Sequence, residues 1–205
     1  MKKITTKEIY WELNRKYGVK PKACLKWESL YDLVEFDWDY IFSLPYKVSR
    51  ETNLQSLQFQ IIHRFYPCNA MLSKWYEDHE DECNFCNTVD TLEHHFYSCT
   101  ETKDFWTAFQ DWWFNVSAVR MSLNLFHIVF GVLNPNDDIL FDSLNFCILF
   151  AKRYIALQKR SEKPYVLEVY LRQLCRRLEC ERIICISNSN LEYFNQKWGF
   201  ILNSF

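Results

Sequence analysis

The sequence predicts a mainly α-helical protein, a multi-helix bundle built around a small Cys-Cys-His-Cys knuckle. Three observations lead to this prediction. Large apolar residues recur at helical intervals in several long segments. The 205 residues include only three glycines and five prolines, too few for the many tight turns of an all-β sandwich. Cysteine and histidine residues also gather between positions 83 and 99 at spacings typical of a metal site.

Composition limits the class of protein. Hydrophobic residues make up 49% of the chain and aromatic residues 18%, which supplies ample material for a core. The formal net charge is −2, so a basic field over the whole protein is excluded, and any contact with nucleic acid must come from a local patch. Along the chain we expect an N-terminal helical segment (1–76), a zinc-binding knuckle with an aromatic helix (77–118), and a C-terminal helical lobe with a basic face (119–205).

The N-terminal segment is predicted to hold three helical stretches. A short helix passes through Tyr10, Trp11 and Leu13, and a second apolar run extends from Cys24 to Tyr40 until Pro45 breaks the pattern. An amphipathic helix follows from Thr52 to Phe65. His63 and Arg64 lie at its C-terminal end, where cations complement the helix dipole, and contact with a phosphate is the alternative interpretation.

The central pattern is Cys83-x2-Cys86-x7-His94-x4-Cys99. A Cys-x2-Cys pair presents two thiolates from one tight turn, and the His-x4-Cys pair adds an imidazole and a third thiolate about one helical turn apart. Four protein ligands leave no position for water, so the spacing favours one structural Zn²⁺. The alternative is four reduced side chains that lie close together without a metal. By spacing alone, His95 is a second candidate for the histidine ligand.

A helix is predicted to start beside the ligands, with Asp90 as its cap and Glu93 reaching back to the Asp90 amide. A second helix begins at Thr100 or Thr102 and carries large rings at helical spacing: Phe105, Trp106, Phe109, Trp112 and Trp113. These rings are interpreted as core, because no Lys or Arg interleaves with them. A stacking platform for unpaired bases is the alternative.

The C-terminal lobe is predicted to contain a short apolar element from Leu123 to Leu133 and a long helix capped by Asp137 or Asp138. A last long helix runs from about Tyr165 to Cys185, and the tail from Asn188 to Phe205 docks as one more short helix. The cations predicted to face a nucleic acid in this lobe are Lys152, Arg153, Lys159, Arg160, Arg172 and Arg176. A solvated surface with ion pairs one helical turn apart is the alternative.

The cysteine count indicates the compartment. The N-terminus lacks the apolar core of a secretory signal, and nine cysteines, with one cluster at metal spacing, are typical of a reducing environment. No stretch is apolar for long enough to span a membrane. We therefore expect an intracellular protein of the nucleus, the cytoplasm or both.

Several of these motifs together resemble a known family. The stretch Leu57-Gln-Phe-Gln-Ile-Ile-His-Arg-Phe-Tyr66, the Cys83-x-x-Cys86 pair, Asp90-Thr-Leu-Glu-His94, Cys99 and Phe105-Trp106 are similar to the zinc-binding C-terminal region of non-LTR (LINE-type) retrotransposon reverse transcriptases. The resemblance covers about Tyr10 to Trp198. It implies that Cys83, Cys86, His94 and Cys99 are the ligands, and that the region helps a polymerase hold its template RNA or target DNA.

The resemblance also implies limits. The chain has no Tyr-x-Asp-Asp polymerase motif and no endonuclease signature, and no nucleophile–base pair stands out in the sequence. We therefore expect no catalytic activity and no small-molecule substrate. The expected function is that of a zinc-stabilised module that binds RNA or single-stranded DNA, with the polymerase portion of a retroelement protein as a further partner. A zinc-stabilised protein-interaction or scaffold module is the alternative.

Overall fold

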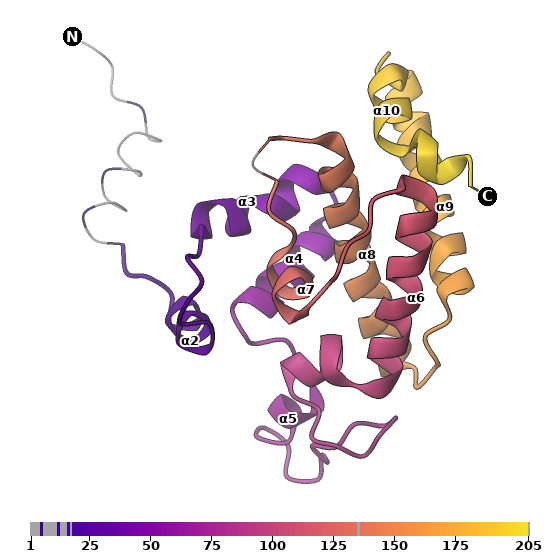
Figure 1. The fold of residues 1–205 in the computed structure, drawn as a ribbon. Helices are drawn as coiled ribbons and strands as arrows, with labels where there is room; N and C mark the ends of the chain where they lie inside the picture. Colours follow the sequence, from indigo (N-terminus) through magenta and orange to yellow (C-terminus); the bar gives the residue numbers. More distant parts are fainter. Residues whose placement is uncertain (1–4, 6–11, 13–15, 17, 135, 205) are drawn as a thin grey trace. The chain divides into compact units, whose positions relative to one another are not determined.

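The computed structural model of the protein describes residues 5, 12, 16, 18–134 and 136–204. Regular structure in these residues is helical, apart from one isolated bridge between Glu82 and Val89, which confirms the predicted mainly α fold (Figure 1). The chain divides into two compact units, Met1–Phe36 and Asp37–Phe205. Residues 77–118 and 119–205 thus share the second unit, and the predicted segment boundaries at 76 and 118 stay a prediction. None of the described helices is long and apolar enough to cross a lipid bilayer.

The first unit contains helix α2 (Lys22–Leu30), which begins directly after Pro21. The helix predicted through Tyr10, Trp11 and Leu13 lies outside the described residues. The apolar run expected from Cys24 to Tyr40 is not one helix, because α2 ends at Leu30.

The second unit opens with α3 (Trp38–Val48), whose start is set by Asp37. The carboxylate of Asp37 accepts a hydrogen bond of 2.9 Å from the Tyr40 backbone N–H. Pro45 lies inside α3, so the predicted break at this residue is wrong. A proline within a helix removes one backbone hydrogen bond, and here the burial of Leu44, Pro45 and Val48 offsets that loss.

Helix α8 (Ile139–Arg160) lies at the centre of the second unit. Helices α3, α4 (Thr52–Ile62), α9 (Leu167–Ser187) and α10 (Leu191–Leu202) all pack against it (Figure 1). The Asp138 carboxylate caps α8 by accepting from the Leu140 N–H at 2.8 Å, as predicted. Apolar residues lie on most sides of the helix from Leu144 to Ile155, which is the pattern of a helix enclosed by others.

Helix α4 buries Leu54, Leu57, Ile61 and Ile62 of the predicted apolar stripe, whereas its last predicted member, Phe65, is 41% exposed. It ends earlier than predicted, at Ile62, because Arg64 adopts a left-handed conformation (φ 59°) that turns the chain out of the helix. The short helix α5 (Asn69–Leu72) follows, and the chain then enters the Cys/His region.

Helix α6 (Thr100–Ser117) carries the large aromatic rings. Phe105, Trp106, Phe109 and Trp113 are each no more than 2% exposed, so they belong to the core. Phe109 lies 5.9 Å from the Tyr170 ring of α9, centroid to centroid. The alternative of a base-stacking platform is wrong for these rings, since no base can reach them.

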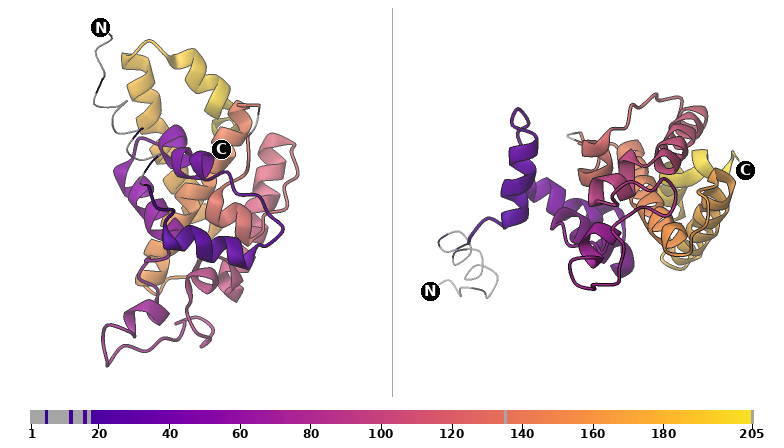
Figure 2. Two further views of the ribbon diagram at one scale, coloured as in Figure 1. Left: turned by 90° about the vertical axis from the view of Figure 1, so that its left-hand side faces the viewer. Right: turned by 90° about the horizontal axis from the view of Figure 1, so that it is seen from below.

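The C-terminal lobe folds as predicted in its main features. Helix α7 (Leu125–Phe130) occupies the predicted apolar element and ends at Gly131. Helix α10 lies against α9 and α8 (Figure 2), and its residues Phe194, Trp198 and Ile201 are buried, which confirms the predicted docking of the tail. The indole N–H of Trp198 also donates to the Glu181 carboxylate of α9 at 3.3 Å, which ties the two helices together.

Candidate metal centre

A tight turn presents the first two cysteines. The bridge between Glu82 and Val89 closes a loop in which the Cys83 N–H donates to the Thr88 carbonyl at 2.7 Å. Within the loop, the Cys83 carbonyl accepts from the N–H groups of Cys86 (3.3 Å) and Asn87 (2.9 Å). These bonds fold the backbone so that the thiols of Cys83 and Cys86 point to the same side.

The histidine and the third cysteine come from a π-helical turn, η1 (His94–Ser98). Residues five apart in an α-helix are rotated by about 140°, which would aim His94 and Cys99 at different faces. In η1 the Cys99 N–H instead donates to the His94 carbonyl at 3.1 Å, an i+5 bond that brings the two residues above one another.

The predicted cap at this turn is wrong. The Thr91 hydroxyl, not Asp90, accepts from the His94 N–H at 3.1 Å. The Asp90 amide donates to the Asp81 carbonyl and so is not available to Glu93. The reason lies in tertiary contacts: the Asp90 side chain is drawn into the protein by two buried partners, and the Glu93 carboxylate pairs with Arg64 at 2.5 Å.

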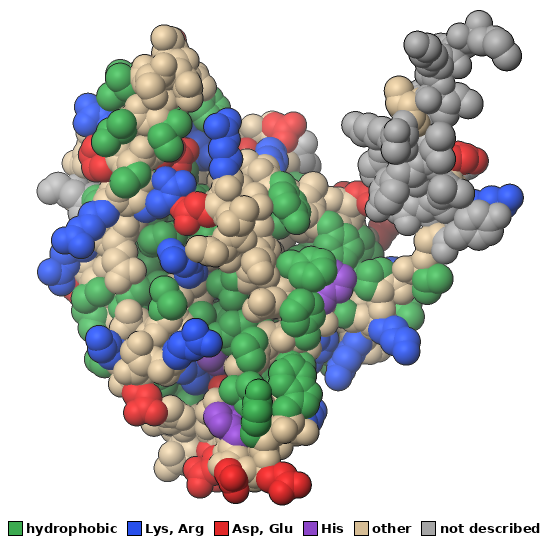
Figure 3. All heavy atoms as spheres, turned by 180° about the vertical axis from the view of Figure 1, so that it is seen from behind, with side chains coloured by type: hydrophobic (Ala, Val, Ile, Leu, Met, Phe, Trp, Pro, Cys, Tyr) green, Lys and Arg blue, Asp and Glu red, His purple; other side chains and the backbone are tan. Residues whose placement is uncertain are grey.

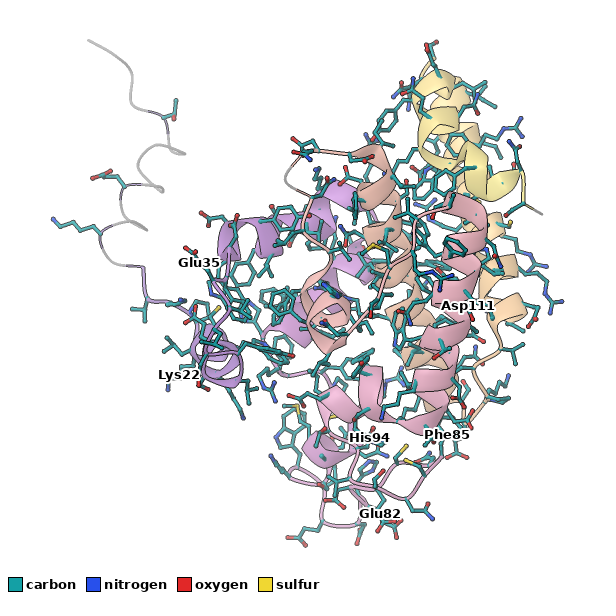
Figure 4. All side chains as sticks on the ribbon, viewed as in Figure 1. Lys22, Glu35, Glu82, Phe85, His94 and Asp111 are labelled. Atoms are coloured by element: carbon teal, nitrogen blue, oxygen red, sulfur yellow. The ribbon has the colours of Figure 1, made fainter. Side chains whose placement is uncertain are left out.

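The four predicted ligands converge. One atom from each of Cys83, Cys86, His94 and Cys99 lies within 4.8 Å of every other, so the group could hold a metal ion. Figure 4 shows sulfur atoms close to His94. The Cys99 sulfur lies 3.8 Å from the Cys83 sulfur and 3.9 Å from the Cys86 sulfur. The Cys86 sulfur lies 3.3 Å from Nε2 of His94. His95 is not part of this group.

The protonation states of the ligands follow from their surroundings. Burial lowers the pKa of His94, so its imidazole is neutral at pH 7 and able to donate a lone pair. Burial raises the pKa of Cys99 to about 11. Burial also acts on the Cys86 thiol, but hydrogen bonds from Thr88 outweigh it and lower the pKa of Cys86. A backbone hydrogen bond from Thr102, at the start of α6, lowers the pKa of Cys99, but burial outweighs it.

His95 anchors a buried network behind the ligands. Its Nδ1 lies 3.1 Å from an Asp90 carboxylate oxygen and its Nε2 lies 3.2 Å from the Tyr66 hydroxyl. Burial lowers the pKa of His95, so the neutral ring donates from Nδ1 to Asp90 and accepts at Nε2 from Tyr66. The other Asp90 oxygen binds the ammonium of Lys159, at 2.5 Å. Burial would raise the pKa of Asp90, but the hydrogen bond from His95 and the charge of Lys159 hold it at about 2.

This network joins the centre to the bundle. Lys159 belongs to α8, His95 to η1, and the Asn69 backbone N–H, at the start of α5, also donates to Asp90 at 3.2 Å. In addition, the Trp106 indole N–H donates to the Phe96 carbonyl at 2.8 Å. The orientation of η1, and with it that of His94, is therefore set from three sides.

Comparison with known proteins does not assign the chain to a family. No family model matches the chain, and no curated protein does. The assignment of a function therefore rests on the residues and their geometry.

The cations predicted to contact nucleic acid fall into two groups. Lys152 and Lys159 are 2% and 4% exposed, with Lys152 donating to the Gln58 side chain and Lys159 bound to Asp90. Neither ammonium can reach a phosphate, so their predicted role is wrong. The sequence could not reveal this, because their partners lie on segments distant along the chain.

His63 and Arg64 are half-buried and engaged within the protein. The His63 ring stacks on Phe42, with centroids 5.6 Å apart, and burial lowers its pKa, so it is neutral at pH 7. Arg64 pairs with Glu93. The remaining four predicted cations are accessible: Arg153 is half-buried, and Arg160, Arg172 and Arg176 are exposed.

Proposed function

We propose that this chain is a zinc-stabilised helical module that binds RNA or single-stranded DNA, of the kind found C-terminal to the polymerase of non-LTR retrotransposons. The observation that carries the proposal is the convergence of Cys83, Cys86, His94 and Cys99. Three thiolates and one imidazole are a typical ligand set for structural zinc. A tetrahedral zinc site with usual bond lengths has sulfur–sulfur edges of about 3.8 Å, and the two sulfur pairs above lie at 3.8 and 3.9 Å.

The zinc would serve the fold and not a reaction. Four protein ligands complete its coordination and leave no position for a substrate or an activated water. The ion would link the Cys83–Cys86 turn to η1 and to the start of α6, a stretch with few apolar residues of its own to hold it. Its binding free energy would therefore contribute directly to folding of this part of the chain.

The accessible arginines are the support for nucleic-acid binding. Arg153, Arg160, Arg172 and Arg176 all lie on α8 and α9, and Lys and Arg side chains are interspersed with apolar ones on the face seen in Figure 3. The five carboxylates of residues 77–82 gather next to the knuckle, which would repel a phosphate backbone. We therefore assign the contact with the strand to the helices and not to the knuckle.

Zinc binding is tested by counting metal. We expect one zinc per chain in the wild type and loss of that zinc in Cys86→Ser, together with partial unfolding seen by circular dichroism. Cys180→Ser is the matched control, because Cys180 is a free, exposed cysteine outside the group. Full zinc occupancy in Cys86→Ser would contradict the proposed site.

Nucleic-acid binding is tested by titrating the zinc-loaded protein with a fluorescent single-stranded RNA and with the matching DNA. If four arginines neutralise phosphates, affinity falls about 50-fold between about 50 and about 200 mM salt, because each contact releases counterions. Absence of binding even at the lower salt concentration would refute the proposal.

A protein-interaction module is the second candidate, favoured by the end of α9. Ile183, Ile184 and Ile186 are 66%, 50% and 53% exposed, an apolar surface that a solvated helix end does not need. This candidate predicts self-association that Ile183→Lys abolishes, measured by sedimentation. It also predicts that Arg172→Glu with Arg176→Glu leaves the interaction intact. A monomer that binds RNA would favour the first proposal instead.

A further inference from the structure

A cavity of about 620 Å³ lies between α4, α5, the loop that joins them and the C-terminal part of α8. Its volume is within the usual range for sites that hold small organic ligands. None of the four metal ligands lines it, although Asp90 and His95 of the network behind them do. The cavity is thus a separate feature on the inner side of the metal centre.

One face of α8 forms a wall with a distinctive order of side chains. Arg153, Ala156, Leu157 and Arg160 all line the cavity, and their spacing of i, i+3, i+4 and i+7 places them on one side of the helix. The two guanidinium-bearing residues are about 10 Å apart along the axis, with the two apolar residues between them. Leu157 is 44% exposed, so this apolar strip is open to an incoming molecule.

The two arginines are available to a ligand. In the described part of the chain neither Arg153 nor Arg160 makes an ion pair, whereas Arg64 and Arg177 are each held by a glutamate. The third cation of the cavity, Lys159, is already neutralised by Asp90. Glu162 also lines the cavity and accepts a hydrogen bond from the Asn84 amide. Two free guanidiniums therefore face one exposed carboxylate, an arrangement suited to an anion.

The opposite wall suits a flat ring. Tyr66 and Pro67 provide aromatic and apolar surface there. Because the Tyr66 hydroxyl is engaged by His95, that side chain is held in place and cannot rotate away. Gln60 adds a side-chain amide at the same wall, and an amide of this kind can donate to and accept from the edge of a base. The Asn69 amide is already bonded to Glu82, Asn84 and His79.

We propose that this cavity binds one unpaired nucleotide. Its base lies between the apolar strip of α8 and Tyr66, and its phosphates lie on Arg153 and Arg160. Stacking on an aromatic ring with phosphates on arginines is the general mode by which single strands are held. The nucleotide belongs to a strand if the proposed function holds, with its 5′ and 3′ phosphates on the two arginines, and a free nucleoside monophosphate offers the same base with one phosphate.

The test uses the full-length, zinc-loaded protein and two probes, adenosine 5′-monophosphate and a short single-stranded RNA. Two variants perturb the site in different ways. Arg153→Gln with Arg160→Gln removes the charges, and Leu157→Trp obstructs the apolar strip of α8 while keeping them. The matched controls are Arg50→Gln with Arg120→Gln, two exposed arginines that lie outside the cavity and outside the proposed strand contact, and Leu133→Trp, since Leu133 is similarly exposed but lies outside the cavity. Thermal unfolding confirms that each variant folds. If the double arginine variant does not fold, Arg160→Gln alone replaces it, because Arg160 is exposed.

We expect the double arginine variant to weaken binding of each probe about tenfold or more, the effect of losing hydrogen bonds to a charged group. Leu157→Trp weakens binding of each probe by obstructing the place of the base, and the controls change it less than about threefold. Monophosphate binding that the cavity variants abolish, without RNA binding, supports the cavity and refutes the proposed function. RNA binding that the cavity variants leave unchanged refutes the cavity and leaves the proposed function standing. If inorganic phosphate competed for the cavity as strongly as the monophosphate does, the inference would also be overturned. Such a result would show an anion site without a place for the base.

Discussion

Lys152 is a cation that the protein would be more stable without. Its ammonium is 2% exposed in the centre of α8, and its hydrogen-bond partner is the side-chain oxygen of Gln58. The Gln58 nitrogen in turn donates to the Val129 carbonyl at 2.8 Å, so the glutamine is fixed and cannot reorient. A buried amine without a carboxylate loses its hydration and recovers little of it. We predict that Lys152→Met raises the free energy of unfolding.

The magnitude follows from the pKa. Burial lowers the pKa of Lys152 from its ordinary value of 10.5 to about 7. At about pH 7, keeping this amine in the core therefore costs about 4 kcal/mol relative to a side chain that never ionises. The methionine variant leaves the Gln58 oxygen without a donor, which costs about 1–3 kcal/mol. The expected net gain is about 1–3 kcal/mol.

The pH dependence of stability gives a second, independent test of the role of Lys152. Because the folded pKa lies below the unfolded one, the unfolded chain binds more protons between the two values, and wild-type stability rises by about 1.4 kcal/mol per pH unit in that window. Urea unfolding with saturating zinc at about pH 7 and about pH 8.5 should therefore show the advantage of the variant shrinking by about 2 kcal/mol. An advantage independent of pH, or a variant destabilised by several kcal/mol, would refute this reasoning.

Three further predictions concern the metal centre and the core. His94→Ala should lose the zinc and His95→Ala should retain it, as measured by metal content after dialysis; zinc loss only in the His95 variant would exchange their roles. Asp90→Asn should lower the free energy of unfolding by about 3–5 kcal/mol in a urea titration, because it leaves the buried charge of Lys159 without its partner; an unchanged midpoint would show that this pair is not buried in solution. Gly131→Ala should lower the melting temperature, because the residue has a φ of 91° and an added Cβ would lie 2.3 Å from Leu44. A melting temperature equal to that of the wild type would contradict this geometry.

The helices show which features of the fold could be predicted from the spacing of residues along the chain. The stripe of α4, the rings of α6 and the Asp138 cap of α8 were all readable from spacing, because each depends on residues within a few turns of one another. The interruption between α2 and α3 was not predicted, because large apolar residues continue through it at nearly helical intervals. Asp37 is nevertheless an ordinary helix cap. Pro45 shows the opposite case, in which packing outweighs a strong local signal to stop.

In the Cys/His region, too, one feature could be predicted from spacing and another could not. The group of Cys83, Cys86, His94 and Cys99 could be predicted because its members lie at the short spacings along the chain that a tetrahedral metal site would require. The choice between His94 and His95 could not be made from spacing. It depends on the side from which Asp90, Tyr66 and the π-helical turn hold each ring.

The sequence alone was enough to determine that this protein is helical and that it carries a compact group of three cysteines and one histidine, since both follow from the order of neighbouring residues. Only the tertiary structure decided which charges meet solvent. Lys152 and Arg153 are adjacent in the chain, yet one is enclosed by the core and the other lines an open cavity. The reason is physical: burial depends on which segments pack against a side chain, and the partners that enclose Lys152 and Lys159 come from residues 94 and 69 positions away.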